Sequence, residues 1–378
     1  MGNKIRNLFL TTNTNCNLRC IYCYEKKDKT VFFNVKEAEE KLAKALSVKT
    51  EGSTIIDLHG GEPFLVFDRI KELCEWCWAQ NFAEHYVFFA TTNGTKVHGK
   101  IKDWLLEHKD RFIAGLSLDG TREMQNMNRS NSFDQIDIDF FAQTWPGQSV
   151  KMTVSPISIN TLADGVIFLH SKGIHNIQVN LAYMVNWRDP KFAKIYQREL
   201  RKLGQFYLKH PDLPLDAIYR LPLKLLILPE ARQRKFCGCG TEMVAVDIDG
   251  REYPCHLFFE SVGGKEKSEG WHDIDFSDPK QYISEECSKC LLYPTCPTCY
   301  GANYLERGDI GARDMSLCTL EKIRTLEVAR FQYERIVNSK DDPDSLSKEE
   351  LAERINTLEA IQKVEPLLKQ IAQEVEAS

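Results

Sequence analysis

The sequence predicts an α/β protein whose first 230 residues form an open barrel of six parallel strands, followed by a cysteine-rich segment and a helical tail. Short β-rich runs end in polar or glycine turns and alternate with amphipathic helical stretches, which favours a parallel sheet with right-handed crossovers. Six such units are too few for a closed eight-stranded barrel. In addition, 11 of the 13 cysteines lie either at 16–23 or at 237–318.

The strands are expected at 4–11, 53–59, 85–92, 111–118, 149–155 and 175–182. The helices between and after them are expected near 35–47, 67–83, 97–109, 133–143, 160–173 and 190–209. The second helix carries Cys74 and Cys77 on one face, which is typical of small thiols packed in a core. We divide the chain into residues 1–230, 231–320 and 321–378.

The helical tail is predicted from two apolar patterns. The first consists of Leu320, Ile323, Leu326 and Phe331. The second opens with a capping box formed by Ser347 and Glu350. It continues through Leu351, Ile355, Leu358, Leu368, Ile371 and Val375, with a kink expected at Pro366. Packing against the rest of the protein is the favoured role of this tail. Dimer formation and peptide binding are the alternatives.

Composition limits the classes of partner. The formal net charge is −5, which gives no indication of a nucleic acid partner. No run reaches the roughly 18 apolar residues that span a bilayer, and no signal peptide opens the chain. We therefore expect a cytoplasmic protein with neither nucleic acid nor membrane as partner. In a reducing compartment, clustered cysteines indicate metal binding more often than disulfides.

Polar residues stand at the ends of several predicted strands: HGGEPFL at 59–65, TTNG at 91–94, SLDG at 117–120, and Asn180. Each of these taken alone is explained by ordinary turn chemistry. Ligands, however, gather at the C-terminal ends of parallel strands in barrels. Because the loop after the first strand carries Cys16, Cys20 and Cys23, the sequence predicts one site at this end of the barrel.

The segment CNLRCIYC places those three cysteines at C-x₃-C-x₂-C. Three thiolates can hold three irons of a 4Fe–4S cluster and leave the fourth iron open. A tetrahedral zinc needs one more ligand, and His59 on the next strand end leaves that alternative open.

CNLRCIYC resembles the signature of the radical SAM superfamily, matching it at every cysteine and at the aromatic residue before the third. The resemblance spans roughly residues 5–230 and implies a partial TIM barrel that cleaves S-adenosylmethionine (SAM) reductively to a 5′-deoxyadenosyl radical. It also implies that Tyr22 packs on adenine and that SAM is contacted by Gly60, Gly61, Glu62, Pro63, Asn93, Ser117, Asp119, Arg129 and Asn180. Among these, Arg129 is placed for a salt bridge to the SAM carboxylate.

The second cysteine group resembles the SPASM extension of radical SAM enzymes that act on peptides and proteins. The resemblance implies one auxiliary 4Fe–4S cluster on Cys237, Cys255 and Cys299, and another on Cys287, Cys290, Cys296 and Cys318, giving three clusters in all. Cys239 either fills the fourth position of the first auxiliary cluster or is an idle thiol. A pair of zinc ribbons is the alternative for this segment.

His256 follows Cys255, where sulfatase-maturating relatives generally carry Asp as a base. The context YPCHLFF is more similar to maturases of ribosomally made peptides. His256 is therefore the candidate catalytic base, with a structural hydrogen bond as the alternative.

The leading interpretation is a peptide maturase that joins a cysteine sulfur to carbon as a thioether. The alternatives, in order, are carbon–carbon cross-linking or epimerisation of a peptide, anaerobic sulfatase maturation, and a non-catalytic iron–sulfur electron carrier. The expected partners are a short precursor peptide and an electron donor such as a flavodoxin or ferredoxin. With 15 residues before Cys16, the sequence leaves no room for an N-terminal leader-binding module, so a separate leader-binding protein is a further candidate partner.

Overall fold

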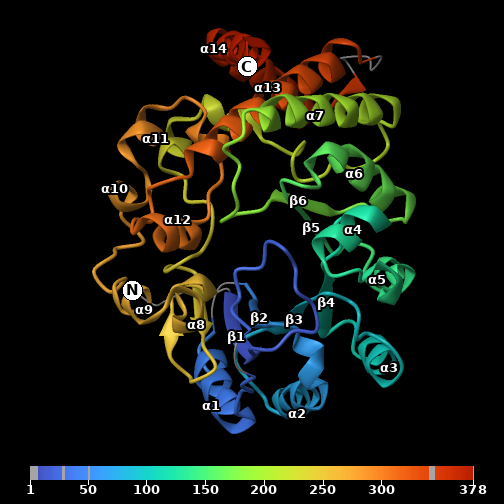
Figure 1. Ribbon diagram of the computed structural model, residues 1–378, viewed down its shortest axis with the longest axis vertical. Helices are drawn as coiled ribbons and strands as arrows, with labels where there is room; N and C mark the ends of the chain where they lie inside the picture. The colour runs from blue at the N-terminus through green and yellow to red at the C-terminus, as the bar shows by residue number, and fades with distance from the viewer. Residues whose placement is uncertain (1–6, 28–29, 50–51, 340–344, 378) are drawn as a thin grey trace.

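The protein is described by a computed structural model that covers residues 7–27, 30–49, 52–339 and 345–377 (Figure 1). Positions 4–6 of the first predicted strand lie outside these residues. The first four barrel strands lie toward one end of the molecule, and the C-terminal helices α13 and α14 lie at the opposite end, where α13 packs against the barrel helix α7. None of the helices in the described ranges combines the length and the apolar composition that crossing a bilayer requires.

All six predicted strands are confirmed, and their neighbours along the barrel pair in parallel. One sheet runs β4-β3-β2-β1 and contains Phe112–Leu116, Tyr86–Thr92, Thr54–Gly60 and Asn7–Asn13. A second sheet contains β5 (Val150–Val154) and β6 (Ile177–Leu181). The two sheets meet where the amide of Leu118 donates to the carbonyl of Lys151 at 2.9 Å. The order of strands is that of an open barrel.

The sheet continues beyond the barrel strands into the cysteine-rich segment. Strand β7 (Met243–Val246) pairs in parallel with β1, and β8 (Glu252–Tyr253) pairs antiparallel with β7. Strands from both sides of the boundary proposed near residue 230 therefore belong to one sheet. This pairing fixes the position of the cysteine-rich segment relative to the first barrel strand.

The predicted barrel helices form as α1 (Val35–Leu46), α2 (Phe67–Trp78), α3 (Lys100–Glu107), α5 (Ile138–Thr144), α6 (Leu162–Ser171) and α7 (Lys191–Lys209). On α2 the Cys74 and Cys77 side chains are fully buried, as expected for packing thiols. Helix α4 (Arg122–Asn128) was not predicted, because its seven residues carry no apolar periodicity. Thr121 caps its N-terminus by accepting a hydrogen bond from the amide of Met124.

Besides β7 and β8, the cysteine-rich segment contains helices that are all short: α8 (Glu260–Gly263), α9 (Lys265–Glu269), α10 (Pro279–Tyr282), α11 (Glu285–Lys289) and α12 (Tyr300–Arg307). The tail forms α13 (Met315–Val337) and α14 (Lys348–Ala377). Helix α13 packs against α7 and α14, and its predicted stripe of Leu320, Ile323, Leu326 and Phe331 is buried.

The predictions for α14 hold in part. The capping box is confirmed, since the amide of Ser347 donates to the Glu350 carboxylate at 2.9 Å and the amide of Glu350 donates to the Ser347 hydroxyl at 3.2 Å. Leu351 and Ile355 are exposed, contrary to the predicted stripe. The buried face of this half of the helix passes through Ala360 and Val364 instead.

The end of β1 is joined to the end of β2 by a short backbone junction. The amide of Gly61 donates to the carbonyl of Asn13 at 3.1 Å, and the amide of Glu62 donates to the carbonyl of Asn15 at 2.8 Å. The side-chain amide of Asn13 returns a bond to the carbonyl of Glu62 at 3.0 Å. These bonds hold the chain immediately before Cys16 against the Gly-Gly-Glu turn.

The junction leaves no space for a side chain on either glycine. A Cβ atom on Gly61 would lie 2.0 Å from the carbonyl oxygen of Asn15, and one on Gly60 would lie 2.4 Å from that of Asn13. Gly60 also has a φ of +147°, which other residues rarely adopt. Since both obstacles are backbone atoms, they cannot turn aside as a flexible side chain would.

We expect Gly61→Ala to lower the free energy of unfolding by about 1–3 kcal/mol, the usual cost of forcing extra volume into a packed site. The measurement is chemical denaturation followed by circular dichroism. Gly147→Ala is the matched control, because nothing lies within 4 Å of a Cβ there. The control is expected to change stability by less than about 0.5 kcal/mol. Equal stability of the two variants would contradict the steric account of the junction.

Candidate functional site

The three N-terminal cysteines lie together in the loop after β1. Cys16 is buried, Cys20 is half-buried and Cys23 is exposed. Burial raises the pKa of Cys20, and the nearby Cys23 and Cys16 add to the rise while Arg129 opposes it. The loop therefore gathers all three thiols in one place, as the sequence predicts.

The residues at the end of α4 and just after it accept hydrogen bonds from the cysteine loop. The amide of Ile21 donates to the carbonyl of Asn128 at 3.0 Å, and the amide of Arg19 donates to the hydroxyl of Ser130 at 2.8 Å. Ser130 has a φ of 55°, in the left-handed region. The cysteine loop is thus fixed between the β1–β2 junction and the end of α4.

The Glu62 side chain makes hydrogen bonds to other groups of the protein. Its buried carboxylate accepts hydrogen bonds from the Thr92 hydroxyl at 2.7 Å and from the amide of Asn93 at 2.8 Å. Burial raises the pKa of Glu62, and these two bonds act against that rise. The carboxylate therefore joins the ends of β2 and β3.

Asn93 stands next to the cysteine loop. Its side-chain amide donates to the side-chain oxygen Oδ1 of Asn17 at 3.1 Å and lies 3.9 Å from the sulfur of Cys16. The end of β3 therefore borders the thiols, in agreement with the expected convergence of strand ends.

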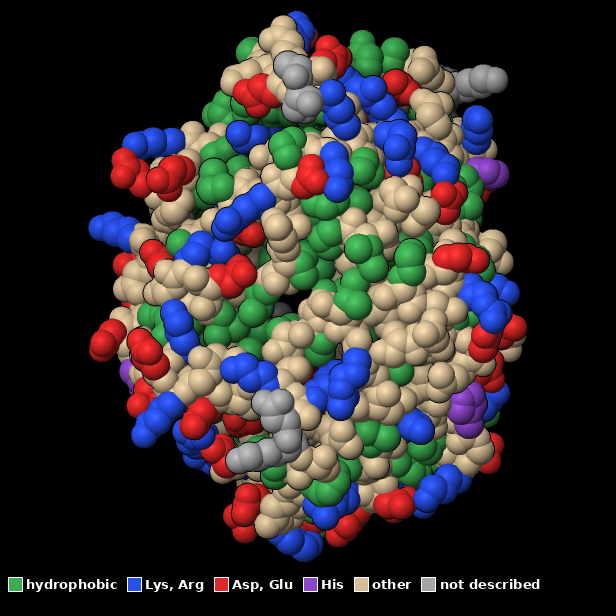
Figure 2. Space-filling model, in the orientation of Figure 1, with side chains coloured by type: hydrophobic (Ala, Val, Ile, Leu, Met, Phe, Trp, Pro, Cys, Tyr) green, Lys and Arg blue, Asp and Glu red, His purple; other side chains and the backbone are tan. Residues whose placement is uncertain are grey.

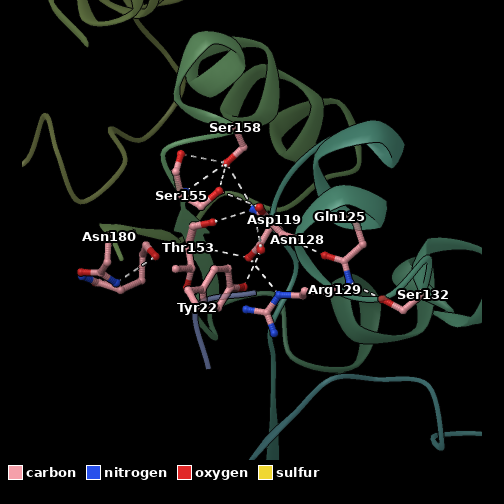
Figure 3. Close-up of polar contacts among 11 residues, drawn as sticks. Tyr22, Asp119, Gln125, Asn128, Arg129, Ser132, Thr153, Ser155, Ser158 and Asn180 are labelled. Carbon is pink, nitrogen blue, oxygen red and sulfur yellow. Dashed lines mark hydrogen bonds and ion pairs between the residues drawn. The ribbon is translucent and has the colours of Figure 1, made fainter. Parts of the chain in front are cut away.

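Asp119, at the end of β4, lies at the centre of a buried hydrogen-bond network (Figure 3). Its side chain is fully buried and accepts bonds from the amide of Thr153 at 2.9 Å, from Asn128 at 3.0 Å and from the Tyr22 hydroxyl at 2.5 Å. The Nε atom of Arg129 lies 3.0 Å from the same carboxylate. Asp119 therefore orients Tyr22 and Arg129, and its own oxygens are taken by protein groups.

Arg129 and Tyr22 face each other across this network. The Arg129 guanidinium lies 5.4 Å from the centre of the Tyr22 ring, a cation–π arrangement. Figure 3 shows that Nε of Arg129 is turned toward Asp119 and that the terminal nitrogens point away from the network. The guanidinium end is thus left free to meet an anionic group.

Two predicted residues lie outside this network. Ser117 is buried, and its backbone amide donates to the carbonyl of Thr92 at 2.9 Å. Asn180 is exposed, and Figure 3 shows it set apart from Asp119 and Arg129. It lines a small cavity of about 50 Å³ together with Cys296 and Arg313. Asn180 therefore lies toward the C-terminal cysteines.

Those C-terminal cysteines form two sets. The first auxiliary set is Cys237, Cys239, Cys255 and Cys299. Burial raises the pKa of Cys299 to about 12, and the nearby Cys255 and Cys237 contribute to the rise. A hydrogen bond between Cys239 and Cys255 raises the pKa of Cys239, with burial as the next cause. Cys239 is therefore a close neighbour of the three cysteines assigned by the resemblance.

The second auxiliary set is Cys287, Cys290, Cys296 and Cys318. Burial raises the pKa of Cys318, and the nearby Cys290 and Cys287 add to the rise. Burial also raises the pKa of Cys296 to about 12, with contributions from Glu321 and from Cys318. The two sets meet in sequence at Cys296 and Cys299, which only Pro297 and Thr298 separate.

The cysteines of the loop and of the two sets are all free thiols. Within the described residues, no three or more His, Cys, Asp or Glu side chains are grouped so as to hold one metal ion. A 4Fe–4S cluster takes thiolate ligands, one to each iron. The loop and the two sets contain ligands of this type.

An aromatic stack lies between the cysteine loop and the first auxiliary set. The ring of His256 lies 4.5 Å from that of His59 and 5.5 Å from those of Tyr24 and Phe9. His59 in turn lies 3.3 Å from the carboxylate of Glu25. The Nδ1 atom of His256 is buried and makes no hydrogen bond in the structure. Burial lowers the pKa of His256 well below its ordinary value, and His59 and Lys151 lower it further.

Sequence reasoning did not identify Tyr24, Asn128 or Thr153 as part of the site. Tyr24 follows Cys23 directly, so its position beside the last cysteine was the available signal. Asn128 and Thr153 act through contacts between segments far apart in the chain, for which the sequence gives no signal.

The chain is similar in sequence to known proteins. Residues 10–137 match the Radical SAM superfamily. The chain is 23% identical over 329 residues to the cysteine-type anaerobic sulfatase-maturating enzyme of Clostridium perfringens (strain 13 / Type A), a match covering 76% of this chain and 86% of that protein.

Two solved structures share the fold. One is anSMEcpe with bound AdoMet and the Cp18Cys peptide, with a TM-score of 0.66, 19% identity, and 88% of this chain and 98% of that chain covered. The other is Streptococcus suis SuiB bound to the precursor peptide SuiA, with a TM-score of 0.54, 18% identity, and 82% and 75% covered. The chain therefore contains a radical SAM domain at residues 10–137, within an overall fold shared with anSMEcpe and SuiB.

Proposed function

We propose that this protein is a SPASM-type radical SAM maturase that oxidises a short, ribosomally made peptide by two electrons and joins a cysteine sulfur of that peptide to a carbon as a thioether. The observation that carries this proposal is the position of Tyr24. Burial raises the pKa of its hydroxyl, and among the further causes are Cys23 on one side and Cys299 and Cys255 on the other. A substrate side chain beside Tyr24 would therefore be near the N-terminal thiols and the first auxiliary set at once.

The surface of the molecule is hollowed near its middle. In the orientation of Figure 1, Figure 2 shows a hollow near the middle of the molecule, bordered mainly by hydrophobic side chains. In this view the hollow lies between α12 and β6. A peptide segment of mixed character suits such an entrance, and the solved neighbours anSMEcpe and SuiB were both captured with peptides.

A 4Fe–4S cluster on Cys16, Cys20 and Cys23 would, with SAM, supply the 5′-deoxyadenosyl radical that removes a hydrogen atom from the substrate. The protein would bind the SAM amino group through backbone carbonyls of the Gly60–Pro63 turn, because the Glu62 carboxylate is already occupied by Thr92 and Asn93. Arg129 would receive the SAM carboxylate on its terminal nitrogens. Tyr22, held by Asp119, would pack on the adenine.

His256 is the candidate base for the substrate thiol. Burial keeps the imidazole neutral, and its unpaired Nδ1 atom lies in the stack that separates the two thiol regions. A neutral imidazole can accept the thiol proton without first losing one of its own.

Sulfatase maturation is the second candidate function. It is favoured by the similarity that covers 86% of a Clostridium perfringens sulfatase-maturating enzyme. Against it stands His256, at the position where such enzymes generally carry Asp. Both functions remove two electrons and two protons from the substrate. Thioether formation takes one hydrogen from the cysteine thiol and one from the carbon that the sulfur joins, whereas sulfatase maturation takes both from the cysteine, whose sulfur then leaves the product. Carbon–carbon cross-linking and epimerisation are weaker alternatives, and a non-catalytic electron carrier has no use for the Arg129 arrangement.

The partners follow from this chemistry. The proposed function requires a peptide substrate and a one-electron donor such as a flavodoxin or ferredoxin. A separate leader-binding protein is a further proposed partner.

Anaerobically reconstituted protein is expected to bind about twelve irons, four in each of three clusters. Changing Cys16, Cys20 and Cys23 together to Ala should remove about four of them and abolish SAM cleavage. Changing the buried Cys74 to Ala is the control and should leave the iron content unchanged. The measurements are iron analysis and detection of 5′-deoxyadenosine. Zinc in place of iron at the auxiliary sets would refute the assignment of two auxiliary clusters.

Arg129→Ala is expected to weaken SAM binding by roughly 1.5–3 kcal/mol, the usual value of a hydrogen bond to a charged group. Lys at this position should restore binding only in part, because it cannot bind a carboxylate through two nitrogens. Calorimetric titration measures the affinity. Arg122→Ala, which removes an exposed arginine at the start of α4, the helix that ends just before Arg129, is the control.

Because Arg129 pairs with the fully buried Asp119, its loss should also lower stability, so the unfolding midpoint is measured alongside. A folded Ala variant with unchanged SAM affinity would remove Arg129 from the SAM site.

His256→Gln is expected to retain SAM cleavage but to lower product formation by about 10²–10⁴-fold, the typical contribution of a general base. The control is His272→Gln, at an exposed histidine in the same segment. The assay is mass spectrometry of the encoded precursor peptide after alkylation. A thioether product would be two hydrogens lighter, would keep its sulfur and would have one cysteine protected from alkylation.

Loss of sulfur from the peptide would instead support the second candidate function. Two hydrogens lost with every cysteine still alkylated would indicate a carbon–carbon bond. Absence of 5′-deoxyadenosine in every reaction would leave only the electron carrier.

A further inference from the structure

Arg313 contacts the sulfur of a cysteine in the second auxiliary set. Its Nη1 atom donates to the Cys296 sulfur at 2.9 Å and to the Cys296 carbonyl at 2.6 Å. A guanidinium is always charged, so both bonds are charge-assisted.

Two aromatic rings fix the position of this guanidinium. It lies 5.4 Å from the centre of the Phe236 ring and 5.1 Å from that of Tyr293. The two rings meet edge to face, and the Tyr293 hydroxyl is anchored on the carbonyl of Arg234 at 2.7 Å. Phe236 directly precedes Cys237 of the first auxiliary set. Arg313 thus occupies the boundary between the two sets, with its hydrogen bond directed to the second.

The charges facing the two sets are unequal. Arg313, Arg324 and Glu321 lie near Cys296, and Lys322 lies near Cys318. Glu321 is paired with Arg324 at 2.9 Å, which cancels one of these positive charges. The first auxiliary set faces Lys235, whose amine bonds to the Cys239 carbonyl and to the Thr241 hydroxyl. The second set therefore has more net positive charge near it than the first set. Of the cations named here, Arg313 is the one that donates a hydrogen bond to a cysteine sulfur.

We propose that Arg313 raises the reduction potential of the cluster held by the second auxiliary set, and so makes it the preferred resting place of an electron that enters through the first. This inference rests on the proposed function, which requires two auxiliary clusters. An added electron increases the negative charge of an iron–sulfur cluster. Hydrogen bonds to its sulfurs and nearby cations stabilise that charge, and both are known determinants of cluster potential.

The electron path is short. Cys296 and Cys299 are joined by two residues, so a covalent connection links a ligand of the second set to a ligand of the first. The electron would come from the substrate radical, which is oxidised by one electron as its bond forms. It would leave the second set for an external one-electron carrier. Arg313 is a positioning residue in this scheme, since it touches neither substrate nor SAM.

The test is an EPR-monitored redox titration in the background that lacks Cys16, Cys20 and Cys23, so that only auxiliary clusters contribute. Changing Cys318 to Ala in that background identifies the signal of the second set. Arg313→Gln is expected to lower the midpoint of that signal by an amount equal to at least a tenfold change in electron occupancy, about 59 mV for one electron. The midpoint of the first set should stay unchanged.

Two further variants make the result decisive. Arg313→Lys keeps the charge and loses the flat contact with both rings, so an intermediate midpoint is expected. Arg234→Gln removes the other guanidinium that lies over Phe236, at 5.4 Å, without touching a cysteine sulfur, and should leave both midpoints unchanged.

Full iron content with an unshifted midpoint in Arg313→Gln would overturn the proposal. Loss of the cluster in both the Gln and the Lys variants would also overturn it, because Arg313 would then be a purely structural residue. The titration uses neither SAM nor peptide, so its outcome is separate from that of the proposed function, which fails if the unaltered protein holds no auxiliary clusters.

Discussion

The site depends on the backbone junction between the end of β1 and the Gly60–Gly61–Glu62 turn. Its hydrogen bonds hold the chain before Cys16 against the end of β2. The Glu62 carboxylate, in turn, accepts hydrogen bonds from Thr92 and Asn93 at the end of β3. Three strand ends are thereby held together by backbone groups and by the buried side chains of Asn13, Glu62 and Thr92. A loop of three thiols is otherwise an irregular segment with many accessible conformations. The junction removes that freedom before any ligand arrives, so the free energy of ligand binding is not spent on ordering the loop.

The parts of the structure that the sequence predicts are those with local signals. Each barrel strand has a β-rich run bounded by turn residues, and the spacing of Cys287, Cys290 and Cys296 marks one thiol set within ten residues. What was missed depends on contacts between distant segments. Helix α4 lacks apolar periodicity. Strand β7 belongs to the sheet through its pairing with β1, which lies more than two hundred residues earlier in the chain. Asn180 stands near the end of β6 in the β5–β6 pair and lines a cavity with Cys296 of the second auxiliary set, so its predicted contact with SAM stays a prediction.

The chemistry of the region between the thiol groups follows from what fills it. Tyr24, His59 and His256 come from three segments. The Tyr24 and His256 rings are stacked, and the His59 ring is tilted against that of His256. An aspartate in place of His256 would bring a charge into this buried stack and would need partners to offset its desolvation. A neutral imidazole avoids that cost. The replacement therefore changes the resting charge of the region, and a thiolate substrate would meet less electrostatic repulsion there than it would beside a carboxylate.

Arg129 and Arg313 have similar surroundings, one beside the cysteine loop and the other beside the second auxiliary set. Each guanidinium lies over an aromatic ring, Tyr22 in one case and both Phe236 and Tyr293 in the other. Each also has one nitrogen fixed by a hydrogen-bonding partner, the Asp119 carboxylate or the Cys296 carbonyl. An ammonium group is more strongly hydrated and would be costlier to bury in such surroundings, whereas the flat guanidinium gains from the ring faces and keeps its direction. A fixed positive charge close to thiolates is what an electron-carrying site requires, because its field is already in place when the electron arrives and no reorganisation is needed. The aromatic rings are therefore as much a part of the electrostatic arrangement as the arginines they hold.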